Sequence, residues 1–210
     1  MTRTSSLPVL ASVAAMLLAG CSALPTAGMA SEPAQVASID PKVKFKDGDR
    51  YLGDLARALN MPRETVCREL GRYDCFSDAF RIVLGGVEAP NLTVNTPLEE
   101  AALTAPIALD RAALHVCTSR VRMDREDPAT AVLFRASASG RPDKAWMETT
   151  SNELYGVLLN RDPTKAERAR LVGFYKDVAT EQGKPNPDAA SDWVTLSCFA
   201  LASSLESIFY

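Results

Sequence analysis

Five cysteines and one histidine are the residues of this 210-residue sequence best suited to chemistry. A thiol can close a disulfide, ligate a metal or act as a nucleophile, and an imidazole can act as a base. Zinc sites usually combine a C-x2-C pair with further cysteines or histidines, and this sequence has neither such a pair nor a second histidine. It therefore predicts no metal site. The residues concerned are Cys21, Cys67, Cys75, Cys117, Cys198 and His115.

The sequence neighbours of His115 do not form a catalytic group. A nucleophile needs a base and an orienting group within reach. Asp110 precedes His115, and Cys117 follows it on a different side of any helix. We expect His115 to be structural. The acidic pair Glu99-Glu100 falls at a predicted helix start, where carboxylates complement the helix dipole. The sequence thus predicts no catalytic residue and no cofactor.

Other polar and aromatic groups are assigned to solvent or to packing. The run "RVRMDREDP" (120–128) alternates in sign and predicts a solvated helix end, and Gly85-Gly86 predicts a helix stop with a turn. The formal net charge of −3 gives no electrostatic footprint for nucleic acid. Four aromatic residues are expected in the core rather than on a binding surface: Trp146, Trp193, Phe209 and Tyr210.

The N-terminus has the features of an export signal. Arg3 is followed by an apolar run from Leu7 to Leu18. About twelve apolar residues suit a signal-peptide core, whereas a membrane-spanning helix needs about 20. The run ends in Leu18-Ala19-Gly20-Cys21, which resembles the signal of bacterial lipoproteins. The resemblance implies cleavage of residues 1–20 and lipidation of Cys21. In these lipoproteins an aspartate directly after the cysteine signals retention in the inner membrane. Ser22 stands at this position instead, so the resemblance also favours the outer membrane.

The segment after Cys21 predicts a flexible tether. Residues 21–45 are rich in Ala, Ser and Pro at their start and poor in large apolar side chains. Such a composition buries too little surface to offset the entropy of ordering the chain. The remaining residues, 46–210, are enough for one domain with its own core.

An even number of cysteines in an exported chain favours disulfides. Four cysteines allow three pairings. Cys67 and Cys75 are too far apart for a bridge if one helix joins them, but Gly71 lies between them and allows the chain to fold back. We therefore favour Cys67–Cys75, which leaves Cys117–Cys198 as the second pair.

Helical periodicity dominates the domain and predicts an all-α fold of about six to eight helices. Two predicted helices begin with a capping box, one at Thr96 and one at Thr164. Pro106 is expected to start a long helix that runs to about Asp124. One last helix is expected to place Val194, Cys198, Leu201, Leu205 and Ile208 on one face. Only 129–138 and "NLTVN" (91–95) are compatible with strands.

Residues 55–70, "LARALNMPRETVCREL", resemble the DNA-binding helix-turn-helix, with Arg63 and Arg68 on the second helix. Export removes the protein from operator DNA. We therefore expect no nucleic-acid binding, and two short helices packed through Leu55, Leu59, Val66 and Leu70.

The C-terminal part contains the turn Leu159-Asn160-Arg161-Asp162-Pro163-Thr164 with Glu167, and a final helix with a short aromatic ending at 203–210. With these features, residues 154–210 resemble the C-terminal helical domain of large, uncharacterised exported bacterial proteins, several of which carry a cytochrome c module. The resemblance implies a helical packing unit and supplies no catalytic residue. The sequence has no C-x-x-C-H motif, so no c-type haem is expected.

These observations predict a lipid-anchored envelope lipoprotein. Its domain would be non-enzymatic and would bind a protein partner or scaffold an envelope assembly. Membrane contact would come through lipidated Cys21, and no small-molecule ligand is identifiable. The alternative is an exported hydrolase whose acidic residues converge only in the folded chain, for example around His115.

Overall fold

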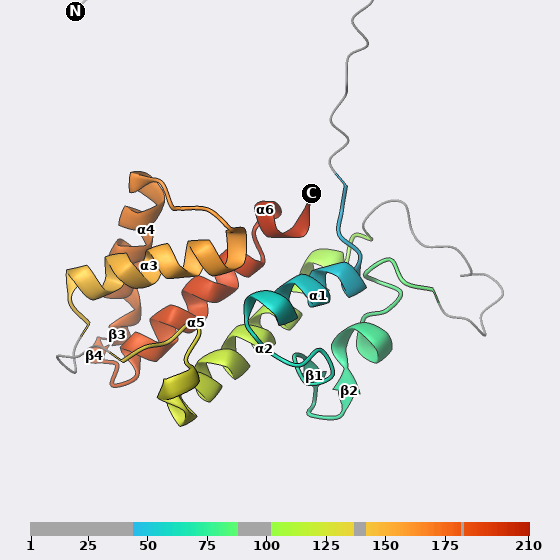
Figure 1. Ribbon diagram of the computed structural model, residues 1–210, viewed down its shortest axis with the longest axis horizontal. Helices are drawn as coiled ribbons and strands as arrows, with labels where there is room; N and C mark the ends of the chain where they lie inside the picture. The colour runs from blue at the N-terminus through green and yellow to red at the C-terminus, as the bar shows by residue number, and fades with distance from the viewer. Residues whose placement is uncertain (1–43, 88–101, 137–141, 182) are drawn as a thin grey trace, which may run out of the picture. The chain divides into compact units, whose positions relative to one another are not determined.

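The computed structural model describes residues 44–87, 102–136, 142–181 and 183–210, and it confirms the all-α prediction. Two short antiparallel hairpins accompany the helices (Figure 1). Cys21, Glu99-Glu100, the Thr96 capping box and residues 91–95 lie outside the described residues. The helices are α1 (Gly48–Ala58), α2 (Ala105–Glu126), α3 (Lys144–Leu159), α4 (Lys165–Val178), α5 (Ala189–Ala202) and α6 (Leu205–Ile208). The strands are β1 (Arg68–Glu69), β2 (Tyr73–Asp74), β3 (Thr180–Glu181) and β4 (Lys184–Pro185), with single turns η1 (Cys75–Ala79) and η2 (Pro128–Thr130).

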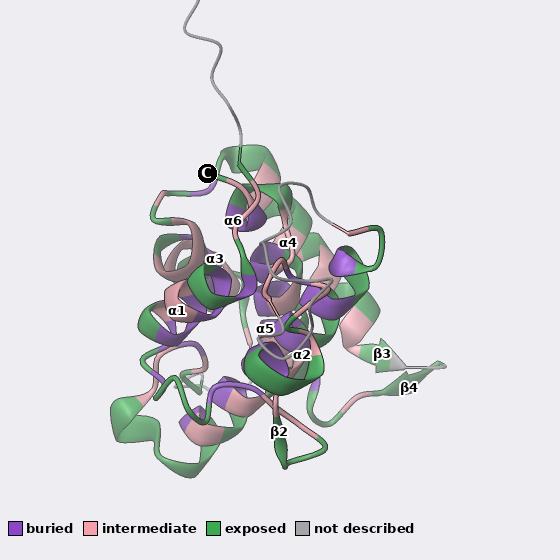
Figure 2. Ribbon diagram, turned by 90° about the vertical axis from the view of Figure 1, so that its right-hand side faces the viewer, coloured by how far each residue is buried: buried purple, intermediate pink, exposed green. Residues whose placement is uncertain are grey.

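The centre of the domain is the contact between α2 and α5. Cys117 on α2 and Cys198 on α5 form a disulfide with a Cα–Cα distance of 5.8 Å, and both residues are buried. This is the second of the two favoured pairs. Helices α3 and α4 pack against α5 and against each other, and Figure 2 shows the buried residues gathered where these helices meet. The apolar faces predicted by helical periodicity therefore meet in one core.

Helix α1 is attached to this core by apolar packing and one buried hydrogen bond. Asp47 caps the helix by accepting the backbone N–H of Arg50 at 2.8 Å. Tyr51, Leu52 and Leu55 are buried. The Tyr51 hydroxyl donates to the backbone carbonyl of Ala202 at 2.9 Å, and burial raises the pKa of this hydroxyl. The contact joins α1 to the C-terminal end of α5.

The chain ends meet where Phe45 forms a β-bridge with Phe209. Lys44 and Tyr210 exchange two backbone hydrogen bonds of 3.0 Å, and the Lys46 N–H donates to the Ile208 carbonyl at 2.9 Å. Residues 44 and 45, assigned to the tether from sequence, are thus paired with the domain.

Three sequence expectations about secondary structure are wrong. Residues 65–70 are not helical, because the chain turns back at Leu70 and Gly71, and Leu70 is exposed rather than packed. The helix predicted to stop at Gly85-Gly86 is also absent, because residues 75–84 form one π-helical turn and further turns. The last helix is broken at Ser203–Ser204, where the Ser204 hydroxyl caps α6 and Leu205 is left 74% exposed. Leu55, Leu59 and Val66 are buried as expected.

Residues 120–128 are not a solvated helix end, since Arg120 and Asp124 are almost fully buried. The Arg120 guanidinium donates to Asp124 at 2.8 Å and lies near the carbonyl of Leu59 at 3.4 Å. The Asp124 carboxylate also accepts three backbone N–H groups, those of residues 132–134, at 2.7 to 3.0 Å. The Arg120–Asp124 pair thus provides hydrogen-bond partners for these backbone groups in place of a neighbouring strand. Residues 131–136 accordingly have no regular secondary structure.

Candidate functional site

The most unusual surface feature is a β-hairpin closed by the disulfide between Cys67 and Cys75, whose Cα atoms are 5.5 Å apart. This is the pairing favoured from the sequence. We call residues 67–75 the clamped hairpin. Strands β1 and β2 pair with Glu69 opposite Tyr73, and the Cys75 N–H donates to the Cys67 carbonyl at 3.2 Å. Disulfide and strand pairing together hold a turn that would otherwise be too short to fold alone.

The clamped hairpin is fixed to α2 by two polar contacts. The Glu69 carboxylate forms an ion pair with Arg111. The Arg68 backbone N–H donates to Nε2 of His115 at 3.3 Å. The Arg68 guanidinium then donates back to the carbonyls of Glu64, at 2.8 Å, and Arg72, at 3.3 Å. These contacts orient the hairpin on the long helix, and the side chains at its tip remain exposed.

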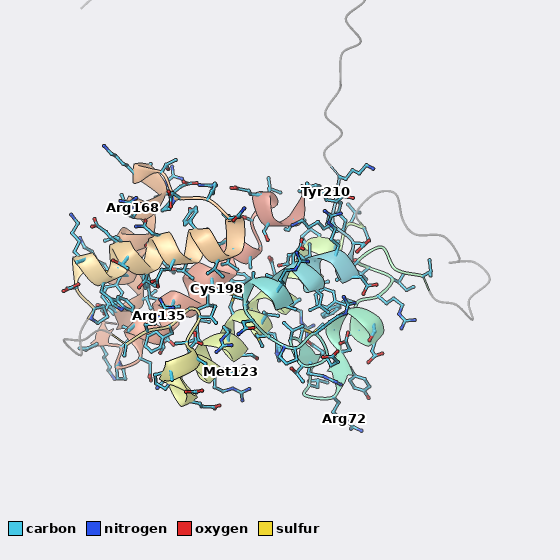
Figure 3. All side chains as sticks on the ribbon, in the orientation of Figure 1. Arg72, Met123, Arg135, Arg168, Cys198 and Tyr210 are labelled. Carbon is cyan, nitrogen blue, oxygen red and sulfur yellow. A yellow bond between two sulfur atoms is a disulfide. The ribbon has the colours of Figure 1, made fainter. Side chains whose placement is uncertain are left out.

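The tip presents an apolar residue to solvent in a strained conformation. Leu70 has a φ of +53° and is 83% exposed, and Gly71 follows with a φ of +70°. A left-handed conformation costs a non-glycine residue about 1–2 kcal/mol. Tyr73 is 50% exposed, and the Arg72 guanidinium lies 5.9 Å from the centre of its ring. In Figure 3 Arg72 projects from the edge of the domain.

The tip carries the positive charge of Arg72, and the carboxylates of this region have partners of their own. Glu69 pairs with Arg111, Asp74 accepts the N–H groups of Phe76 and Ser77, and Asp78 accepts the Asp74 N–H. Among the described residues, no carboxylate lies within ion-pair distance of Arg72. Beside the exposed Leu70, the tip thus presents Tyr73 and Arg72, and Tyr and Arg are enriched in binding hot spots.

His115 has a structural position. Its Nε2 is occupied by the Arg68 N–H. Burial lowers the pKa of the imidazole, with Glu69 opposing and Arg122 assisting the shift. Asp110 is exposed, and Cys117 is tied in its disulfide. Within the described ranges, no three His, Cys, Asp or Glu side chains gather as a metal site would require.

Of the four aromatic residues predicted in the core, Trp193 is buried there, and Trp146 and Phe209 are partly buried against it. Trp193 is fully buried, and its ring centre lies 5.5 Å from that of Trp146. Phe209 makes an edge contact with Phe45. Tyr210 differs from the expectation, because it is 54% exposed and lies 3.9 Å below the guanidinium of Arg50. Helix α6 ends at Ile208, and Tyr210 follows it in the segment that pairs with Lys44.

The turn at 159–167 is a structural ion-pair network. The Arg161 guanidinium bonds to Glu167 at 2.8 Å and to Glu206 at 2.6 Å, joining the start of α4 to α6. Thr164 and Glu167 form the predicted capping box. The hydrogen bonds from Arg161, and then those from Thr164, lower the pKa of Glu167 to about 2. This network positions helices and offers no group to a substrate.

Comparison of the chain with models of protein families, with curated proteins and with solved structures finds no match. No helix in the described part of the chain combines the length and the apolar character needed to cross a bilayer.

Proposed function

We propose that this protein is a lipid-anchored lipoprotein of the bacterial cell envelope, most simply of the outer membrane, with a non-enzymatic domain that binds a protein partner. The clamped hairpin is the contact surface. The observation that supports this most is Leu70, held 83% exposed at a φ of +53° in a disulfide-closed turn.

The position of Leu70 is costly in free energy. Exposing a leucine leaves about 1.5–3 kcal/mol of burial energy unused, and the left-handed backbone adds strain. Nothing inside the described domain returns this energy, because Leu70 packs against no core residue. Strained, exposed residues held by a rigid frame are typical of sites that act on another molecule. A frame that is ordered before binding also lowers the entropy cost of association.

The anchoring part of the proposal rests on Cys21 and its surroundings. The Leu18-Ala19-Gly20-Cys21 signal supports lipidation, and two disulfide pairs support an oxidising compartment. Lipid on Cys21 would restrict partners to those within reach of the tether, in or beside the membrane.

The hydrolase alternative would need carboxylates converging on His115 in a cavity. The carboxylate that acts on His115 is Glu69, which is paired with Arg111. His115 lines none of four surface cavities that the described residues form. We therefore favour binding over hydrolysis.

The anchor is tested by intact mass and fractionation of the chain and of its Cys21→Ser variant. We expect the wild-type chain in the membrane fraction, cleaved before Cys21 and carrying lipid mass, and the variant at full length. A soluble, full-length wild-type chain would overturn the anchoring.

The contact surface is tested by a photoreactive amino acid at position 70, introduced in cells of the organism that encodes the protein. Leu205 provides the matched control, because it is an exposed leucine (74%) on α6. We expect one protein to cross-link from position 70 and not from 205, and the product to disappear with Arg72→Glu. The same products from both positions would refute the hairpin as the contact.

A further inference from the structure

A groove of about 530 Å³ lies between the C-terminal end of α4, the β3–β4 hairpin and the outer face of α5. Its apolar surface comes from Phe174, Val178 and Leu196. Its polar groups include Asp177, Asn186 and Asp192. A volume of this size is in the range of small-molecule sites, which combine apolar walls with a few fixed polar groups. The groove is separate from the clamped hairpin, which contributes none of these residues.

One of the two carboxylates is held in place by its surroundings. The side-chain amide of Asn186 donates to Oδ2 of Asp192 at 2.9 Å and to the carbonyl of Val178 at 3.2 Å. The Asn186 side-chain oxygen accepts the N–H of Asp188 at 2.9 Å. The side-chain nitrogen and oxygen of Asn186 are thus both engaged in hydrogen bonds that connect α4 to α5. No described residue donates to the other oxygen of Asp192, so that oxygen keeps its capacity to accept a hydrogen bond.

The electrostatics of the groove favour a cation. It lies between the C-terminal end of α4, whose dipole is partially negative, and the N-terminal end of α5, whose dipole is partially positive, so the two aspartates determine the sign of the charge. Asp177 is in the last turn of α4, and Asp192 is in the first turn of α5. Within the described residues, neither Asp177 nor Asp192 has an ion-pair partner, whereas the nearby Asp188 is paired with Arg125 at 3.2 Å.

We propose that this groove binds a small organic cation, an ammonium or guanidinium ion with an apolar body. The charged group would lie between Asp177 and Asp192, and the apolar part would contact Phe174 and Leu196. The apolar wall disfavours a hydrated inorganic cation, since such an ion would leave that surface unused. The proposal does not depend on the clamped hairpin or on the lipid anchor.

The test compares two probes of similar shape on the full chain, 4-phenylbutylammonium and the uncharged 4-phenylbutan-1-ol. Amide chemical shifts in nuclear magnetic resonance spectra report both the position and the strength of binding. We expect saturable shifts at residues 174–178 and 192–196 for the ammonium ion, with a dissociation constant of about 1 mM or below. We expect the alcohol to bind about tenfold more weakly, because it lacks the charge.

The variant Asp177→Asn should weaken ammonium binding about fivefold to tenfold and leave alcohol binding unchanged. The Asp177 side chain makes no hydrogen bond within the described residues, so the substitution spares the fold. Asp162→Asn, at an exposed aspartate before α4, is the matched control and should change nothing. Equal binding of the two probes, shifts outside the groove, no saturable shift, or equal effects of the two variants would overturn the proposal.

Discussion

The two disulfides of this domain hold very different regions. Cys117–Cys198 joins two long helices in a buried core and spans 81 residues of sequence. Cys67–Cys75 spans 8 residues and closes a hairpin whose tip is almost entirely exposed. In the α2–α5 core the side chains already pack, and the covalent bond adds stability. In the clamped hairpin few apolar side chains are buried, so the bond and the polar contacts to α2 supply the shape.

Removing each disulfide measures this contrast most directly. Loop-closure entropy predicts a loss of about 4.5 kcal/mol for the Cys117→Ala, Cys198→Ala variant and about 2.5 kcal/mol for Cys67→Ala, Cys75→Ala. Urea unfolding of both variants under non-reducing conditions gives the two free energies of unfolding. Equal losses would mean that the hairpin disulfide is as important for the fold as the core disulfide.

Asp124 is the next largest effect expected in the core region. Asp124→Ala leaves buried Arg120 without its partner and three backbone N–H groups without an acceptor, so we expect a loss of about 4 kcal/mol. Asp110→Ala, at an exposed position on the same helix, should change stability by less than about 0.5 kcal/mol. Thermal or urea unfolding measures both. A small loss for Asp124→Ala would show that water replaces the carboxylate at this site.

The clamped hairpin should respond with the opposite sign. Leu70→Gly removes the left-handed strain and an unused apolar surface, and we expect a gain of about 0.5 kcal/mol after the entropy cost of glycine. The same change at the matched control, Leu205→Gly, falls in a helix and should cost about 0.5 kcal/mol. Unfolding midpoints compare the two. Destabilisation by Leu70→Gly would show that Leu70 contributes to the fold.

The smallest effect expected is a pH dependence through His115, which fixes the hairpin to α2. Burial lowers the pKa of His115 in the folded state, so the unfolded chain binds more protons below pH of about 6.5. The contribution of His115 to the free energy of unfolding is fully present above that pH. It decreases as the pH falls towards the pKa of the folded state. His115→Gln should flatten the change between about pH 5 and 7. An unchanged slope would place the titration elsewhere.

Helices were predictable where their signals are local. The Thr164 capping box, Pro106 at the start of α2 and the apolar faces of α3 to α5 depend on neighbours three or four residues away. The Arg120–Asp124 pair has the same local spacing, which is also that of a surface ion pair. Its burial depends on carbonyls at 59–60 and N–H groups at 132–134, and sequence spacing does not reveal that these come together.

The candidate site was predicted in part. The cysteines and Gly71 indicated that the chain folds back between positions 67 and 75. Leu70 was misassigned because its spacing from Val66 fits a helical apolar face, whereas the turn requires it in a left-handed conformation. The sequence nonetheless contained a signal. Leu70 directly precedes a glycine between two cysteines eight residues apart, and a disulfide between these cysteines requires a turn there rather than a continuous helical face.

The pairing of Phe45 with Phe209 has a mechanical consequence. Both views place this bridge and the clamped hairpin on opposite sides of the domain (Figures 1 and 2). A force applied to the chain before residue 44 acts first on the backbone hydrogen bonds that join residues 44 and 46 to Tyr210 and Ile208. It acts on the N-terminus of α1 only after these bonds. The C-terminal residues therefore bear such a force first, and they would separate from residues 44–46 before the clamped hairpin is disturbed.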